Sequence, residues 1–408
     1  MTVWTQTSGK KIWGLHPNVF FTGLTSLLTD VSSEMIFNLL PLYLTNVLRA
    51  PVSVVGLVGG LAEGADAVFR MLSGWLSDKI GKRKVLAVAG YGISTAAKPF
   101  LYLANAWGGV LAVRFTDRLG KGIRSSARDA LIADSVSPSE RGRAFGLHRA
   151  MDTAGAFIGL TITVLVVWFV LGAGTKDLTM GVFKGLALGA FIPGALAVIL
   201  MQALVHDVEQ ATPTATRFPL SGVRGAFKSR FWILLAILAI FNLGSMPANY
   251  SVILRAQNVG APLIQVLLML VLFNGVYALA AMPMGILSDK LGRRRLLALG
   301  WFVYAVTYVG FALSSHIWQV WVAFAFLGFY MGMVDGVSRA FVADMAPAEM
   351  RGTAYGLYYW VVGISVLLGG IIGGLVWDNI GPAATFYLGA GLAFLAILGI
   401  MTLVKEKE

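Results

Sequence analysis

Gly74-Trp-Leu-Ser-Asp-Lys-Ile-Gly-Lys-Arg-Lys84 is a short polar link between two long apolar runs. It contains an acid, Asp78, a glycine, Gly81, and four cations. The link returns almost unchanged as Gly285-Ile-Leu-Ser-Asp-Lys-Leu-Gly-Arg-Arg-Arg295, half the chain length later. A repeat of this period is far longer than the unit of a solenoid and indicates two similar halves.

Composition indicates a membrane protein. Of the 408 residues, 57% are hydrophobic and only 13% are charged, and the mean hydropathy is +0.76. Soluble domains carry about 25% charged residues, so we expect lipid to surround most of this chain. The net charge of +12 does not indicate nucleic acid, because the cations lie at the ends of apolar runs. The absence of cysteine excludes disulfides and thiolate sites.

Apolar runs long enough to cross a bilayer, about 20 residues, occur twelve times. They are residues 18–47, 53–77, 85–105, 108–133, 144–172, 181–204, 231–257, 261–286, 296–314, 317–343, 353–377 and 382–404. Basic residues concentrate in the links after every second run, which predicts that both termini are cytoplasmic. We expect one six-helix bundle in residues 1–204, a cytoplasmic linker in 205–230 and a second bundle in 231–408.

A second pair of loops supports the duplication. Asp134 to Gly146 matches Asp344 to Gly356, and each segment links the fourth and fifth apolar runs of its half. With both loop pairs, the chain resembles a major facilitator superfamily transporter over its whole length. The resemblance implies an all-α membrane protein whose twelve transmembrane helices form two pseudo-symmetric bundles around a central cavity, which opens alternately to each side.

No motif of an enzyme is visible, and we expect no catalytic residues, cofactor or metal. The expected partners are a small-molecule substrate, protons and the lipid bilayer, without nucleic acid. We predict a monomeric multi-pass protein of the cytoplasmic (inner) membrane.

Charged residues inside the apolar runs are costly and need a partner or a function. Asp30 and Glu34 lie four residues apart on one helix face. Two close carboxylates do not easily both ionise in a low dielectric, which makes the two residues candidates for proton coupling. Static pairing with a nearby cation is the alternative. Glu63 and Asp66 are further candidates, and Arg118 is added because Arg118 and Gly122 are similar to a family pattern linked to proton transfer.

Substrate contacts are expected from both halves. The cationic residues of 108–133 favour an anionic group, because guanidinium groups suit carboxylate and phosphate. Polar and aromatic residues of the second half supply the shape of the site, although most aromatic residues are explained by packing alone. The substrate-binding candidates are Arg114, Arg118, Asn242, Asn274, Asp335, Arg339, Tyr355 and Tyr359.

The repeated link predicts a cytoplasmic gate. Asp78 and Asp289 lie where helices end, and each can face the positive N-terminal end of a helix from the other half. The gate residues are Gly74, Asp78, Gly81, Arg83, Gly285, Asp289, Gly292 and Arg294. Simple positive-inside anchoring explains the lysines, but it does not explain the acid or the glycine.

We predict a secondary active transporter that is coupled to protons, with efflux of a drug or metabolite favoured. One alternative is proton-coupled import of an organic anion or a metal chelate, and another is a non-transporting membrane sensor on the same fold. Gly155 and Gly159 are similar to the family's antiporter pattern, but Leu160 stands where that pattern has proline.

Overall fold

The computed structural model describes residues 12–80, 82–137, 140–208, 227–245, 250–346 and 351–404. These ranges consist of helices joined by short loops and turns, and no β-strand occurs in them. The N-terminal half contains α1 (Pro17–Phe37), α2 (Leu40–Leu42), η1 (Tyr43–Val47), α3 (Val52–Ile80), α4 (Arg83–Ala97), η2 (Lys98–Tyr102), α5 (Trp107–Asp134), α6 (Arg141–Leu171), α7 (Met180–Gly189) and α8 (Phe191–Leu204). The C-terminal half contains α10 (Ser229–Leu243), α11 (Tyr250–Asn258), α12 (Leu263–Leu291), α13 (Arg293–Leu313), α14 (Ile317–Met345), α15 (Arg351–Asn379) and α16 (Pro382–Leu403).

The twelve predicted spans are confirmed as helices, four of them as two or three consecutive helical pieces. Proline accounts for two of these interruptions, because it removes a backbone donor and clashes with the preceding turn. Pro41 lies where α1 gives way to α2, and Pro99 lies where α4 gives way to the 3₁₀ helix η2. Within the described residues, eight helices are long and apolar enough to cross a membrane.

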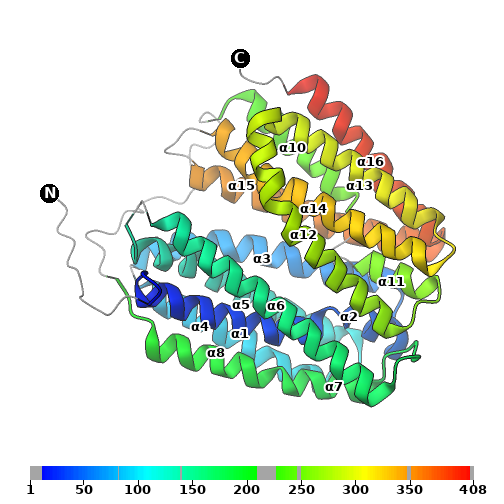
Figure 1. The fold of residues 1–408 in the computed structure, drawn as a ribbon, viewed down its shortest axis with the longest axis horizontal. Coiled ribbons are helices and arrows are strands. Elements are labelled where there is room, and N and C mark those ends of the chain that lie inside the picture. Colours follow the sequence, from blue (N-terminus) through cyan, green and yellow to red (C-terminus); the bar gives the residue numbers. More distant parts are fainter. Residues whose placement is uncertain are drawn as a thin grey trace.

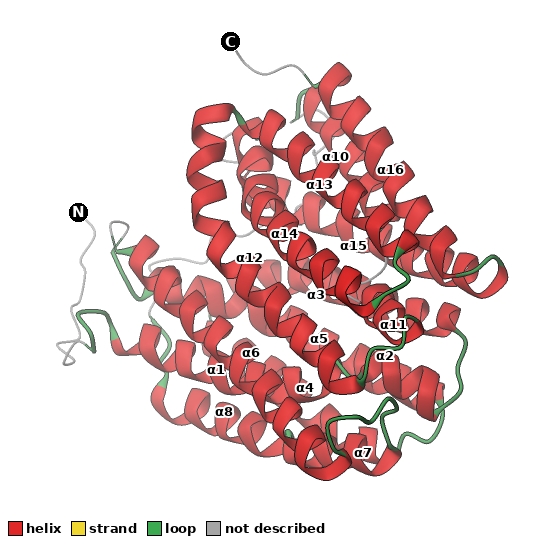
Figure 2. Cartoon of the chain, turned by 45° about the vertical axis from the view of Figure 1, so that its right-hand side comes forward, coloured by secondary structure: helices red, strands yellow, loops and turns green. Residues whose placement is uncertain are grey.

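The two halves lie side by side as separate bundles (Figures 1 and 2). In the N-terminal half α1 packs on α6 and α8, and α5 packs on α3 and α4. In the C-terminal half α12 packs on α14, and α13 packs on α14 and α16. We call the end at which α1 begins and α16 ends the terminal end, and the opposite end, at which α3 begins and α15 ends, the far end.

The helices α3 and α15 form the closest contact between the halves. Their backbones approach so closely that a Cβ atom on Gly56 would overlap the carbonyl oxygen of Gly370. A Cβ atom on Gly374 would likewise meet the backbone of Ser53. Small residues permit such approach in membranes, where packing rather than hydrophobic burial drives helix association.

Hydrogen bonds between the halves hold the far end together. The Asp378 carboxylate on α15 accepts hydrogen bonds from the backbone N–H groups of Val52 and Ser53, both at 2.8 Å. It therefore caps the N-terminus of α3, where backbone donors and the helix dipole favour an anion. Asn46 also donates to Gln257 at 3.1 Å. The sequence predicted such capping between halves at the terminal end, whereas this contact lies at the far end.

Corresponding ion pairs brace the terminal end of each half. Arg83 on α4 pairs with Asp134 at 3.1 Å, and Arg293 on α13 pairs with Asp344 at 2.7 Å. These acids are equivalent members of the second repeat. The arginines of the two pairs are not equivalent in the first repeat, where Arg83 aligns with Arg294 and not with Arg293. Arg294 donates instead to the carbonyl oxygen of Val404 at 2.7 Å.

Replacing Asp378 with alanine should weaken the far end, because it leaves the first N–H groups of α3 without their cap. Loss of an N-cap costs about 1 kcal/mol, which corresponds to a severalfold shift between closed and open far ends. The chain contains no cysteine, so spin labels on cysteines introduced at Trp107 and Trp318 would report the separation of the halves. We expect a larger long-distance population in Asp378→Ala.

Asn379→Ala is the matched control, since the Asn379 amide donates only to the Leu375 carbonyl of its own helix. Identical distance distributions for Asp378→Ala and the unsubstituted protein would contradict the role of this cap.

Candidate functional site

A cavity of about 420 Å³ lies between the two halves. The N-terminal half contributes residues of one helix, α3, and the C-terminal half contributes residues of α10 to α15. The lining residues are Glu63, Asp66, Ala67, Arg70, Asn242, Ser245, Val252, Phe273, Asn274, Tyr277, Tyr304, Tyr308, Leu327, Tyr330, Met331, Tyr359, Val362, Gly363 and Val366. Its volume is in the range of sites for small organic molecules.

The α3 wall of the cavity is charged. Glu63 pairs with Arg118 of α5 at 3.2 Å, and Asp66 pairs with Arg70 at 2.6 Å, one turn further along α3. The guanidinium of Arg70 also lies over the ring of Tyr359 on α15, 5.1 Å from its centroid. Since Tyr359 belongs to the other half, this cation–π contact joins the two halves at the edge of the cavity.

The opposite wall is aromatic and polar without charge. Tyr304 and Tyr308 stack at 3.9 Å between centroids, and Tyr330 lies 4.9 Å from Tyr304. Asn242 and Asn274 each donate their Nδ2 to a carbonyl one turn earlier in their own helix, at 2.7 and 2.9 Å. Their Oδ1 atoms are therefore left as acceptors on this wall.

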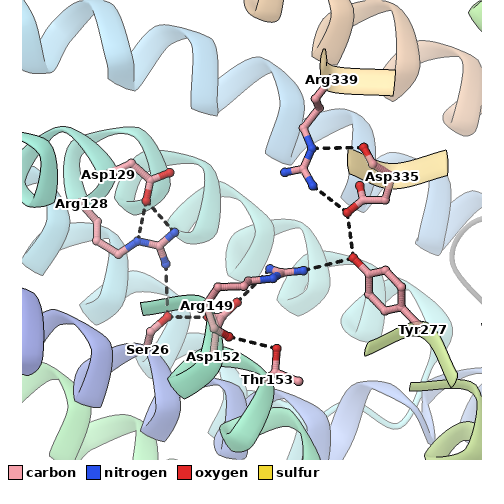
Figure 3. Close-up of polar contacts among 9 residues, drawn as sticks. All are labelled: Ser26, Arg128, Asp129, Arg149, Asp152, Thr153, Tyr277, Asp335 and Arg339. Atoms are coloured by element: carbon pink, nitrogen blue, oxygen red, sulfur yellow. Dashed lines mark hydrogen bonds and ion pairs between the residues drawn. The ribbon is translucent and has the colours of Figure 1, made fainter. Parts of the chain in front are cut away.

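A pair of carboxyl groups lies in the N-terminal half. The carboxyl group of Asp30 on α1 lies close to that of Asp152 on α6. Asp152 also accepts from the Ser26 hydroxyl at 2.7 Å and pairs with Arg149 at 3.1 Å (Figure 3). Arg128 donates to Ser26 at 3.2 Å from the other side.

Arg149 carries this network across to the C-terminal half. Its Nη2 donates to the hydroxyl of Tyr277 on α12 at 3.5 Å, and Tyr277 donates to the Asp335 carboxylate on α14 at 2.7 Å (Figure 3). Arg339 closes the chain by pairing with Asp335 at 2.7 Å. Tyr277 also lines the cavity, so one residue borders the cavity and binds both halves.

The structure separates the other predicted residues into two groups. Glu63, Asp66, Asn242, Asn274 and Tyr359 line the cavity. The remaining candidates, Arg114, Arg118, Asp335, Arg339 and Tyr355, are not among the lining residues.

Two of the predicted charged residues are engaged by near neighbours. Arg114 is buried, paired with Asp117 at 3.2 Å and stacked on the ring of Phe37 at 3.9 Å. Glu34 accepts from Asn38 at 2.6 Å.

The predicted gate is described only in part. Gly81 and the side chains of Asp78 and Asp289 lie outside the described residues. Gly74 lies against Ser126 of α5, and Gly285 faces open space. Gly292 ends α12 at a φ of 87°, a conformation that favours glycine.

Within the described ranges, no group of three or more His, Asp or Glu side chains could hold a metal ion. The contacts of the site are ion pairs, aromatic stacking and hydrogen bonds.

Comparison with known proteins identifies the family of the chain. A sequence profile of the Major Facilitator Superfamily matches residues 22–254 and 244–408. The chain belongs to the Major Facilitator Superfamily. An uncharacterized MFS-type transporter of Methanocaldococcus jannaschii is 35% identical over 389 residues, which cover 94% of both chains. Membership makes the chain a multi-pass membrane transporter of a small molecule.

Other members of the superfamily show how far this likeness extends. A "Probable 4-methylmuconolactone transporter" of Cupriavidus pinatubonensis is 27% identical over 372 residues, 86% of this chain and 82% of its own. A mutant of the nucleoside transporter NupG has a TM-score of 0.79 at 13% identity, covering 95% of this chain and 100% of its own. A mutant of a peptide transporter POT has a TM-score of 0.78 at 12% identity, covering 97% of this chain and 95% of its own. At such identities these structures share the fold alone.

Sequence reasoning missed several residues of the site. The cavity tyrosines Tyr277, Tyr304 and Tyr308 carry no sequence signal that separates them from packing residues. Asp152 is a charge inside an apolar run, but nothing in the sequence pairs it with Asp30. Its contact with Asp30 depends on the packing of α1 against α6, which spacing along one helix does not reveal.

Replacing Tyr277 with phenylalanine should destabilise the protein while the ring still packs on Phe273. The change removes the hydroxyl that donates to Asp335 and accepts from Arg149, and a hydrogen bond to a charged group contributes roughly 1.5–3 kcal/mol. We expect a lower melting temperature for the purified protein in detergent. Tyr387→Phe, at an exposed ring with no described hydrogen bond, is the control, and equal melting temperatures for the two variants would contradict the bridge.

Proposed function

We propose that this transporter is proton-coupled and carries its substrate through the central cavity by alternating access. Basic residues concentrate at the terminal end, which supports placing that end in the cytoplasm and the protein in the cytoplasmic membrane. One chain supplies both walls of the cavity, which supports a monomer as the working unit.

The close approach of the Asp30 and Asp152 carboxyl groups is the observation that carries proton coupling. An ionised carboxylate only accepts hydrogen bonds, so the two groups can hydrogen-bond to each other only when one of them holds a proton. Two ionised carboxylates close together inside a membrane would repel each other strongly. The pair is therefore suited to take up and release one proton.

Loss of that proton would disturb the contact between the halves. Arg149 binds both Asp152, at 3.1 Å, and the Tyr277 hydroxyl, at 3.5 Å. With both carboxyls ionised, the guanidinium would be drawn towards the two negative charges and away from Tyr277. Protonation of Asp30–Asp152 thus favours one arrangement of α6 against α12, and deprotonation favours another.

Substrate and proton would act on the same residue. Tyr277 lines the cavity and accepts a hydrogen bond from Arg149. A substrate that binds against Tyr277 would therefore also change the ion pair between Arg149 and Asp152. Such a coupling is reciprocal: if protonation favours substrate binding, the substrate must favour protonation to the same degree.

Proton movement in proteoliposomes tests this function without a known substrate. The protein is reconstituted with a pH-sensitive dye inside the vesicles, and small organic acids, bases and neutral compounds are added outside one at a time. We expect at least one compound to change the internal pH, and Asp30→Asn to abolish that change.

Asp177→Asn is the control, because Asp177 is an exposed acid at the far end. Proton movement that persists in Asp30→Asn, or transport of a compound without any proton movement, would contradict the proposed coupling.

A further inference from the structure

The charges on the cavity wall are balanced within ion pairs. Glu63, Asp66 and Arg70 are the charged side chains among the described lining residues. Asp66 and Arg70 pair with each other at 2.6 Å, and Glu63 pairs with Arg118 of α5 at 3.2 Å. Lys121 of α5 lies within electrostatic range of these acids but does not line the cavity. On the described wall, a ligand therefore contacts members of two ion pairs rather than an isolated charge.

This pairing disfavours a charged substrate. A carboxylate bound at Arg70 would lie beside Asp66, and an ammonium bound at Glu63 would lie beside Arg118. Each ligand would therefore be repelled by a like charge as well as attracted by its partner. A charge that has no partner of its own is costly inside a membrane, and a neutral ligand avoids that cost.

Each ion pair keeps a hydrogen-bonding atom for a ligand. Glu63 and Arg70 each have 29% of the side chain exposed. Arg118 binds Oε1 of Glu63, while Oε2 has no partner among the described residues. Arg70 binds Asp66 through Nη2, and its Nη1 has no described partner. The two side chains leave α3 seven residues apart, which places an acceptor and a donor about 10 Å apart along the helix axis.

The opposite wall offers groups that accept or both accept and donate. Asn242 and Asn274 each use one N–H on their own helix, which leaves the Oδ1 and the second N–H. The hydroxyl protons of Tyr277 and Tyr304 are donated to protein acceptors at 2.7 and 3.3 Å, so these residues present rings and oxygen acceptors. The hydroxyl groups of a ligand suit such a wall, because a hydroxyl both donates and accepts.

We propose that the substrate is a small neutral ring compound with several hydroxyl groups. Its hydroxyls hydrogen-bond to Glu63, Arg70 and the two asparagines, and its ring packs against the cavity tyrosines. This inference rests on the proposed proton coupling and adds the charge and class of the substrate. It departs from the anionic group favoured by the cations of residues 108–133, because Arg114 and Arg118 are held in ion pairs and do not line the cavity.

A neutral substrate makes transport dependent on the membrane potential. One proton that moves together with a neutral molecule carries one net charge across the membrane, and exchange of the two also moves one charge. An anion carried with one proton, or a cation exchanged for one, would move no net charge. Since the membrane potential acts on each charge that crosses, it should change the rate of transport even without a pH gradient.

Binding of matched probes to the purified full-length protein tests the substrate class. Phenyl and methyl glycosides are used as the neutral glucoside, the anionic glucuronide and the cationic glucosaminide, in slightly acidic buffer of constant ionic strength. We expect the glucosides to bind roughly tenfold more tightly than either charged form. Glucosides whose affinity does not exceed that of their charged counterparts would overturn the inference.

Glu63→Gln tests the balance of charge on the wall. It leaves Arg118 without its acid but keeps a side-chain carbonyl as an acceptor. We expect the ratio of glucuronide to glucoside affinity to rise roughly tenfold. Asp344→Asn is the control, because it removes the acid of the Arg293 pair and neither residue lines the cavity. An equal ratio in the two variants would contradict the argument from ion pairing.

A potassium diffusion potential across proteoliposomes tests the charge that is moved. The signal is the difference in proton movement between the unsubstituted protein and Asp30→Asn, which removes the passive leak. We expect a potential of one sign to accelerate substrate-dependent proton movement and the opposite sign to slow it. Proton movement that depends on Asp30 but does not respond to the potential would overturn the neutral substrate and leave the proton coupling intact.

Discussion

The cost of placing charge inside a bilayer is the constraint on which this molecule depends. The N-terminal half meets it with ion pairs, most of them within one helix and some between helices, such as that of Arg118 on α5 with Glu63 on α3. One contact is of a different kind: Asp30 and Asp152 meet as two acids, and only a proton makes that contact favourable. The same network extends through Arg149 to Tyr277 in the other half (Figure 3). The proton site and the contact between the halves thus belong to one network of hydrogen bonds and ion pairs.

The two halves repeat in sequence but differ in chemistry. The acids and cations of the cavity wall come from α3, whereas α10 to α15 supply tyrosines and amides. The equivalent ion pairs Arg83–Asp134 and Arg293–Asp344 preserve the common scaffold at the terminal end. This division is consistent with a charged half that responds to protons and an aromatic half that fits the substrate. At the far end, Asp378 and the α3–α15 contact hold the halves together.

The fold was predictable because its signals are local and repeated: apolar runs of bilayer length and two matched pairs of loops. Candidate residues were predictable one at a time, since a charge in an apolar run is conspicuous. Their partners were not. Asp30 was expected to act with Glu34 on the same helix, but Asp152 approaches it because α1 packs on α6. The cavity tyrosines and the cap by Asp378 likewise depend on contacts between distant segments, which residue spacing does not encode.

Infrared spectroscopy tests the shared proton most directly, because a protonated carboxyl group has a carbonyl band that a carboxylate lacks. The measurement uses purified protein without substrate at neutral pH and compares Asp30→Asn with Glu34→Gln. The Asp30–Asp152 pair predicts a protonated carboxyl band that disappears in Asp30→Asn and persists in Glu34→Gln. No such band in the unsubstituted protein, or a band that Asp30→Asn leaves unchanged, would contradict the shared proton and the coupling that depends on it.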